Sequence, residues 1–441
     1  MFKTLANAFK VKEIRKKLLF TLLMLVVIRI GSLLPIPGVN TAYFTSLFSG
    51  DGLGLVNAMT GGALSQGSVF ALGISPYITS SIIMQLLAIA IPALEEMQKD
   101  GEDGRKKIAK ITRFLTIGLA LIQSIAMIIG FGNQGLIKGY SSMSVGEKIY
   151  SAALMSIILT AGSAILMWIG EKITEKGVGN GISIVLIINI ISTIPEDFVR
   201  LFYQFIKGQS VLKATIAIVL IIVIVLGVII LTVLICAGER KIPVQYSKKI
   251  QGRRAYGGNA THIPLKVNTA GVIPVIFAQS LMSIPVIIAS FADVDEKSIG
   301  GKIIRGLSTQ NWFDKDNMIY TLGIIVYIAL IIFFAYFYTS ISFNPVEVAN
   351  NMKKSGGFIP GIRPGKPTSE YLTKILNKMI FIGAIALIIV AIIPIICSGL
   401  FGANVSFGGT SLIIIVGVVV ETIRQIESQM VVRDYKGFLN D

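Results

Sequence analysis

Ten long apolar stretches divide this chain, and they constrain its fold more than any other feature of the sequence. A helix needs about 20 mostly apolar residues to cross the hydrocarbon core of a bilayer, and most of the stretches reach or approach that length. The stretches cover 18–34, 71–91, 114–131, 149–169, 181–194, 214–236, 268–291, 318–341, 379–397 and 410–423. The pattern predicts an all-α membrane protein with ten transmembrane helices.

The basic residues alternate between crowded and sparse segments. Thirty Lys and Arg residues lie in the termini and in every second connecting segment, nine lie in the alternate segments, and Arg29 lies inside the first stretch. Because cytoplasmic segments carry the excess of Lys and Arg, both termini are predicted to be cytoplasmic. The expected location is an inner membrane, where part of the net charge of +16 meets anionic lipid headgroups. Arg29 is expected to snorkel or to pair locally.

Five stretches precede the segment 195–213 and five follow it. An odd number of spans per half gives the halves opposite orientations, as in many transport proteins, whose central passage lies between the repeats. We therefore expect an N-terminal half at 1–194, an external hinge loop at 195–213 and a C-terminal half at 214–441.

Three segments are too short or too polar for an ordinary span. Segment 55–70 is uncharged, half apolar and rich in Gly and Ser, and it runs directly into the second stretch. Non-helical backbone at membrane depth requires cover from protein or a wet cavity, so the segment either folds back into the bundle or forms an external loop. The stretches at 181–194 and 410–423 are short and marked by polar residues, which favours the bundle interior. These polar residues are Asn180, Asn189 and Glu421.

Two cytoplasmic loops, 238–268 and 342–378, are long, basic and rich in turn residues. Loops of this length in a compact protein are often functional. Their Lys and Arg residues could bind nucleic-acid phosphates, acidic proteins or lipid headgroups, or could serve only to fix topology.

The sequence offers no catalytic or metal-binding pattern. A single histidine, His262, excludes H-E-x-x-H and Ser-His-Asp schemes, and Cys236 and Cys397 suggest neither a disulfide framework nor a metal site. No series of Asp or Glu crosses the spans as in proton-driven transporters, so the energy for transport would come from a partner or an outside gradient. We expect no enzyme activity and no cofactor. A small-solute secondary transporter is the alternative, and an intramembrane enzyme is a weaker one.

Seven runs spread in order over nearly the whole chain carry a family resemblance. They are RIGSLLPIPGV (29–39), TGGALSQGSVFALGISPYITSSIIMQLL (60–87), GEKITEKGVGNGISI (170–184), QGRRAY (251–256), THIPLKVNTAGVIPVIFA (261–278), FNPVEVANNMKKSGGFIPGIRPG (343–365) and FGGTSLIIIVGVVVE (407–421). In these runs the chain resembles the SecY family, the channel-forming subunits of the bacterial protein-conducting translocon. The resemblance implies two inverted five-helix halves that enclose an hourglass channel closed by a plug at 55–68.

The resemblance also assigns roles to individual residues. The plug would include Leu55, Gly61, Gly62, Leu64, Ser65 and Ser68. The pore ring would consist of Ile74, Ile78, Leu186, Ile276, Ile284 and Ile414, with Leu186 at a position where the family more often has Ile. Gln85 and Asn180 match polar positions near a lateral gate, and Arg253, Arg254 and Arg363 match a cytoplasmic docking surface. Opposed aliphatic side chains suit a narrow pore because they exclude water and so block ions.

Finally, the resemblance implies a function and partners. The chain would pass unfolded polypeptides across the membrane and release hydrophobic segments laterally into lipid, between the second and third spans and the seventh and eighth. SecE would clamp the two halves, SecG would usually be present as a further subunit, and the SecA ATPase or the ribosome would supply the force. The substrates would be secretory and membrane proteins that carry signal segments.

Overall fold

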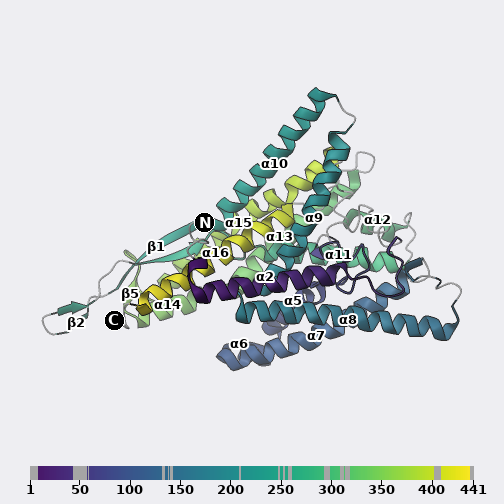
Figure 1. Cartoon of the computed structure of the whole chain (residues 1–441). Coiled ribbons are helices and arrows are strands. Elements are labelled where there is room, and N and C mark those ends of the chain that lie inside the picture. The colour runs from purple at the N-terminus through teal and green to yellow at the C-terminus, as the bar shows by residue number, and fades with distance from the viewer. Residues whose placement is uncertain are drawn as a thin grey trace.

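The computed structural model describes residues 8–42, 57, 59–131, 135–137, 139, 143–207, 210–246, 249–251, 254–256, 261–292, 298–307, 312, 318–401 and 409–437. Helices dominate it, and each apolar stretch lies largely within one long helix (Figure 1). In chain order these helices are α2 (Lys12–Leu33), α5 (Ser75–Ala90), α7 (Gly101–Phe131), α8 (Val145–Lys176), α9 (Gly181–Phe205), α10 (Val211–Ala237), α11 (Ile273–Ala292), α13 (Leu322–Ser342), α15 (Lys366–Phe401) and α16 (Gly409–Gly437). The predicted helical membrane-protein class is confirmed.

Six described helical segments are long and apolar enough to cross a membrane. A seventh candidate arises if α5 and α6 (Pro92–Lys99), which are bent by 108° relative to each other, count as one span. The bend falls at Ile91, which is extended because a residue before proline is disfavoured in the helical region. The total of ten membrane spans therefore stays a prediction.

Helix α9 is longer than its apolar stretch. It continues through Pro195 to Phe205, so the expectation of a loop over all of 195–213 is wrong for the first part of that segment. A proline within a membrane helix is tolerated where neighbouring groups satisfy the freed backbone. The continuation is amphipathic, with Asp197 buried and Phe202 exposed, and its acidic residues end the apolar stretch before the helix ends.

The helices pack as two groups that follow the chain. Helices α2, α5, α7, α8 and α9 contact one another, and helices α10, α11, α13, α15 and α16 form the second group. The main contacts between the groups join α9 to α16 and α7 to α11. This grouping is consistent with the predicted halves, and their inverted relation stays a prediction.

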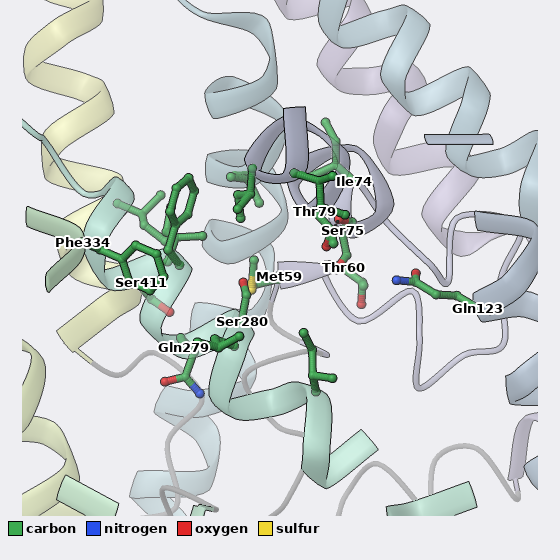
Figure 2. Close-up of a pocket in the computed structure, with 18 of the residues that line it drawn as sticks. Met59, Thr60, Ile74, Ser75, Thr79, Gln123, Gln279, Ser280, Phe334 and Ser411 are labelled. Carbon is green, nitrogen blue, oxygen red and sulfur yellow. Dashed lines mark hydrogen bonds between the residues drawn. The ribbon is translucent and has the colours of Figure 1, made fainter. Parts of the chain in front are cut away.

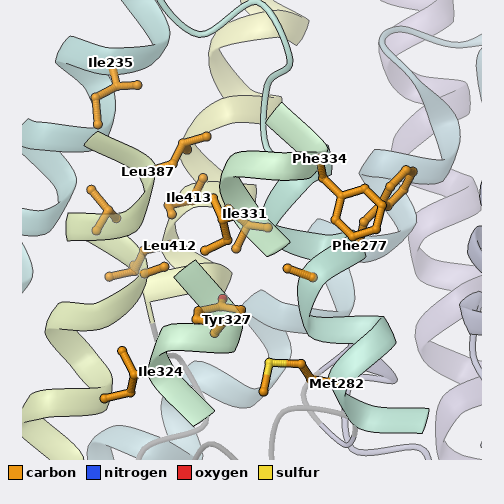
Figure 3. Close-up of a cluster of buried hydrophobic side chains, with 14 of the residues drawn as sticks. Ile235, Phe277, Met282, Ile324, Tyr327, Ile331, Phe334, Leu387, Leu412 and Ile413 are labelled. Atoms are coloured by element: carbon orange, nitrogen blue, oxygen red, sulfur yellow. The ribbon is translucent and has the colours of Figure 1, made fainter. Parts of the chain in front are cut away.

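Two large buried clusters lie in the helical bundle. The first, here the scaffold core, is built mainly from α10, α11, α13, α15 and α16 (Figure 3). It consists of Val228, Ile235, Val275, Phe277, Ala278, Met282, Trp312, Ile324, Tyr327, Ile331, Phe334, Leu387, Val390, Ala391, Leu412 and Ile413. The second, here the central core, joins the first group of helices to Ile414 and Val418 of α16. Side chains of α16 therefore belong to both clusters.

The first basic loop, 238–268, forms a β-ribbon, which was not predicted from the sequence. Strand β1 (Glu239–Tyr246) pairs antiparallel with β4 (Thr261–Lys266), and Ile242 faces Ile263 across the pair. Buried and exposed residues alternate along β1 because successive side chains point to opposite faces. Between β1 and β4 in the sequence, β2 (Lys249–Gln251) pairs with β3 (Arg254–Tyr256) as a separate two-stranded sheet.

The second basic loop is also ordered into short elements. It contains α14 (Pro345–Lys354), β5 (Gly357–Phe358), which pairs with the end of β1, and the start of α15. Apolar side chains of the ribbon pack on α14 and α15 in a third cluster that includes Val244, Met352 and Leu372. Both basic segments therefore form one small domain at an end of the bundle (Figure 1). The remaining elements are α12 (Ile299–Leu307) and the short helix η4 (Met318–Thr321).

Candidate functional site

A cavity of about 290 Å³ lies between the two groups of helices (Figure 2). Its walls come from α5, α7, α9, α11, α13 and α16, together with the irregular segment that precedes α5. The lining residues are Met59, Thr60, Ile74, Ser75, Thr79, Ile82, Ile83, Leu86, Gln123, Leu186, Ile276, Phe277, Gln279, Ser280, Leu281, Ile284, Phe334, Ser411 and Ile414. Both halves of the sequence thus contribute to one mainly apolar site.

Five of the six predicted ring residues line this cavity. They are Ile74, Leu186, Ile276, Ile284 and Ile414. Three of them are almost completely buried, with Ile74 at 1%, Leu186 at 5% and Ile414 at 3% exposure. Ile284, one of the last lining residues of α11, is 44% exposed. Residues more than 300 positions apart in the sequence therefore meet at one aliphatic wall.

The sixth ring residue, Ile78, lies next to this wall rather than on it. It is half-buried on α5 and packs against the central core, as Ile276 does. Because Ile78 follows Ile74 by one helical turn, the two side chains lie on the same face of the chain at the start of α5. The structure therefore brings Ile78 close to the other five without placing it in the cavity lining.

The segment before α5 is a compact series of turns within the protein. Ala63 and Ser68 are fully buried and Leu64 is 6% exposed, so this described part is not an external loop. Its turns are closed locally: the hydroxyl of Ser65 donates to the carbonyl of Gly62 (2.8 Å), and Ser68 forms a β-bridge with Pro35. The prediction that the segment folds back into the bundle is confirmed for these residues.

Two consecutive glycines make one of these turns possible. Gly61 and Gly62 have φ angles of +69° and +80°, a region that residues with a Cβ atom rarely adopt. Leu55, the first residue of the predicted plug, lies outside the described residues. The other predicted plug residues all lie in the turns beside the cavity.

The two predicted gate residues do not line the cavity. The amide of Gln85 donates to the hydroxyl of Ser81 within α5 (3.3 Å). Asn180 caps α9, since its side-chain oxygen accepts from the backbone N–H groups of Ile182 (3.1 Å) and Ser183 (3.4 Å). Local bonds account for both residues, and a role at a gate stays a prediction.

Sequence reasoning missed the polar residues that do line the cavity. Gln123 of α7 and Gln279 of α11 lie on opposite sides of it in Figure 2, and α7 and α11 form one of the two main contacts between the groups. A glutamine within an apolar stretch was the available signal, because polar side chains inside a membrane face the bundle interior or a cavity. Thr60, Thr79 and Ser411 add hydroxyl groups to the same lining.

Two of the three predicted docking arginines belong to the small domain at the end of the bundle. Arg363 is exposed in the turn between β5 and α15, and its carbonyl accepts from the hydroxyl of Thr368 (2.8 Å). Arg254 begins β3 in the β2–β3 hairpin. Arg253 lies outside the described residues.

This small domain is tied directly to the bundle by a partly exposed ion pair. Arg424 of α16 lies 2.9 Å from Glu239 at the start of β1, and it also donates to the carbonyl of Ala237 (3.4 Å). The helix that carries Ile414 is therefore connected to the base of the ribbon. Among the described residues, no group of three or more His, Cys, Asp or Glu could hold a metal ion.

Comparisons with known proteins agree with this architecture. A family model described as SecY matches residues 68–423. The chain is 46% identical to the protein translocase subunit SecY of Streptomyces galbus over 453 residues, which cover all of both chains.

Two solved structures share the fold. One is described as showing that the plug domain of the SecY protein stabilises the closed state of the translocation channel; it has a TM-score of 0.64 at 19% identity and covers 95% of this chain and 92% of its own. The other is Sec61 in a canine ribosome–channel complex from the endoplasmic reticulum, with a TM-score of 0.63 at 19% identity and coverage of 95% and 93%. The family match and the full-length identity together mean that the chain belongs to the SecY family.

Proposed function

We propose that the chain is the protein-conducting channel of a Sec translocon, through which unfolded polypeptides cross the membrane. The observation that carries this proposal is the aliphatic wall, where buried Ile and Leu side chains from α9, α16 and the start of α5 meet around one cavity. A passage between two groups of helices suits a substrate that must both cross the membrane and leave sideways. The full-length relative named as a translocase subunit supports the same reading.

The aliphatic wall would act as a seal that any polypeptide can open. A narrow apolar constriction excludes water and therefore blocks ions. Aliphatic side chains change rotamer readily and offer no charge that would hold a passing segment. In this proposal the chain binds no cofactor and catalyses no reaction, and a motor supplies the energy.

The turns before α5 would form the plug. We assign this role to Leu55–Ser68, whose described residues pack beside the cavity while Met59 and Thr60 form part of its wall. In this position the segment covers the aliphatic wall and adds a second barrier to ions. The description of the solved SecY structure, in which the plug domain stabilises the closed state, supports the assignment.

Lateral release would occur where α5 and α7 face α11 and α13. The α7–α11 contact is one of the two main contacts between the groups, and it borders the cavity at Gln123 and Gln279. Interhelical hydrogen bonds between polar side chains in membranes contribute only about 0.6 kcal/mol on average. Hydrogen bonds of this strength between the two groups would be weak enough for a hydrophobic signal segment to replace them.

The small domain built around the β-ribbon would receive the motor. The comparison with a ribosome-bound Sec61 channel supports a ribosome as one partner, and SecA is the second motor in this proposal. We place Arg253, Arg254 and Arg363 on the docking surface, with SecE and SecG as further subunits. The chain is a multi-pass membrane protein, and we propose the bacterial inner membrane with both termini in the cytoplasm.

Reconstitution tests this function. The purified chain, together with its co-purifying subunits, is placed in liposomes with SecA, ATP and an unfolded secretory protein. We expect ATP-dependent protection of the substrate from added protease. Substrate that stays fully digestible, under conditions in which another SecY complex protects it, would contradict the proposal. Uptake of a small solute by the same liposomes would instead favour a secondary transporter.

A further inference from the structure

Side chains from two other helices bind the backbone of the plug segment. Nη1 of Arg29, on α2, donates to the carbonyl of Gly61 (3.0 Å) and to the hydroxyl of Ser192 on α9 (2.8 Å). One turn earlier on α9, Nδ2 of Asn189 donates to the carbonyl of Met59 (3.0 Å). The hydroxyl of Ser192 donates to the backbone carbonyl of Asn189 (2.6 Å), and it lies 3.4 Å from the carbonyl of Gly61. Two carbonyls of one turn are thus held by two helices.

These contacts are unusual for their place in the chain. Arg29 is the only Lys or Arg of the first apolar stretch, and an ionisable residue inside a span is costly unless it has a function there. Asn189 is 1% exposed, and its side-chain oxygen has no hydrogen-bond partner among the described residues. The side-chain amide of Asn189 therefore lies in the interior of the protein, and among the described residues its hydrogen bond is the one from Nδ2 to the carbonyl of Met59. Neither residue is among those that line the cavity.

The other end of the segment is fixed differently. The N–H of Val69 donates to the carbonyl of Leu34, and the N–H of Ile36 donates to the carbonyl of Gly67, both at 3.0 Å. This backbone bridge holds the chain just before α5 and depends on no side chain. The first end is held by side chains that can change partner, whereas the second end is an anchor about which the turns can swing.

We propose that Arg29 and Asn189, linked through Ser192, form a latch that keeps the plug segment closed, and that breaking this latch is a separate step of channel opening. The inference rests on the proposed plug function. Both latch helices belong to the first group, so the two groups of helices can separate while the latch stays intact. Release of the plug therefore requires a force on the segment itself, such as a polypeptide entering the cavity beside Met59 and Thr60.

The two neighbouring glycines provide a matched test. A Cβ atom at Gly61 would lie 2.7 Å from Nη1 of Arg29 and 3.0 Å from both Cα of Asn189 and Oγ of Ser192. A Cβ atom at Gly62 would have only Oγ of Ser65 near it, at 4.0 Å. Both positions have similar positive φ angles, so alanine brings similar backbone strain to each. Only Gly61→Ala also displaces the latch.

The experiment measures exposure of the plug in the full chain with its subunits. Ala63, which is 0% exposed, is replaced by Cys in a background in which Cys236 and Cys397 are Ala. A membrane-impermeant maleimide is added to spheroplasts from the outer side, and ion leak is measured in liposomes. We expect Arg29→Gln and Gly61→Ala to raise both rates about tenfold, Arg29→Lys to raise them less, and Gly62→Ala to stay within about twofold of the parent.

Two results would overturn the latch. One is that Arg29→Gln and Asn189→Leu show the same labelling rate and the same ion leak as the parent protein. Asn189→Leu is included in case Arg29→Gln does not insert into the membrane. The other is an equal effect of Gly61→Ala and Gly62→Ala, which would assign the effect to backbone strain alone. Measuring ion leak after removal of residues 55–68 distinguishes failure of the latch from failure of the plug. If the shortened channel leaks, the plug function stands even if the latch fails. If the shortened channel does not leak, the plug function itself is refuted.

Discussion

The scaffold core and the plug segment lie beside the same cavity, yet they are built in different ways. The scaffold core is held by side-chain packing, with the rings of Phe277 and Phe334 at 5.4 Å and perpendicular, and those of Trp312 and Tyr327 also at 5.4 Å. The plug segment also buries Ala63 and Leu64, but its backbone is held by hydrogen bonds from other helices, and two consecutive glycines shape one of its turns. The scaffold core depends on close side-chain packing, whereas the hydrogen bonds that hold the backbone of the plug segment can be broken one at a time.

This difference shows how one chain can be both stable and openable. Close packing in a core resists partial displacement, because a small shift loses many contacts at once. A few hydrogen bonds can be exchanged with water or with a passing peptide at a small net cost in free energy. We infer that the scaffold core determines stability and that the plug segment with the aliphatic wall determines closure.

The largest expected effect is on stability. Ile331 is fully buried in the scaffold core and does not line the cavity. Ile331→Ala should lower the free energy of unfolding by about 2–5 kcal/mol, since it removes packed methylene groups and leaves a cavity. Thermal unfolding of the purified complex measures the loss, and ion leak should stay at the wild-type level. Strong leak from this variant at a temperature where it is folded would erase the distinction between the two regions.

A polar residue in the aliphatic wall should instead raise the ion leak. Burying an amide at Ile414 without a partner costs about 1–3 kcal/mol, so Ile414→Asn should favour a wetted, open channel. Export of a substrate with a defective signal segment and ion leak should both rise. Val419, on the same helix but 40% exposed, provides the control. If Val419→Asn loosens selectivity as much as Ile414→Asn, the wall is not the seal.

The smallest expected effect on the stability and closure of the channel comes from a residue outside both regions. Arg363→Glu reverses one exposed charge of the small domain, where a lost charge-assisted contact to a motor costs about 1.5–3 kcal/mol of binding and nothing of folding. Translocation driven by SecA or by ribosomes should slow, while the unfolding temperature and the leak stay unchanged. If Arg363→Glu translocates substrate at the wild-type rate with both motors, Arg363 does not bind a motor and only helps to set the membrane topology.

Much of the fold could be predicted because the bilayer simplifies it. Each of the ten apolar stretches lies largely within one long helix, since an apolar run in lipid has to satisfy its own backbone. The boundaries were less predictable: α9 continues to Phe205 through acidic residues, because a helix that leaves the membrane need not stay apolar. The β-ribbon at 239–266 was missed because basic residues and Pro hide the alternation of Ile242 and Val244.

The site was predictable only in part, and for a different reason. An isoleucine in an apolar span looks the same whether it faces lipid or a cavity, so Ile74 and Ile414 could be found by family resemblance but not by pattern. Gln123 carried a readable signal that was not used. The bonds from Arg29 and Asn189 could not be foreseen, because they depend on two backbone carbonyls whose positions only the folded chain defines.

The central claim is that closure resides in the plug segment and the aliphatic wall, apart from the packing that keeps the protein folded. Steady ion conductance of reconstituted channels, with and without residues 55–68, tests it most directly when the unfolding temperature of both proteins is measured alongside. We predict a sustained leak in the shortened channel and little change in its unfolding temperature. Equal conductance in the two proteins, or a leak that appears only as the shortened protein unfolds, would contradict the account.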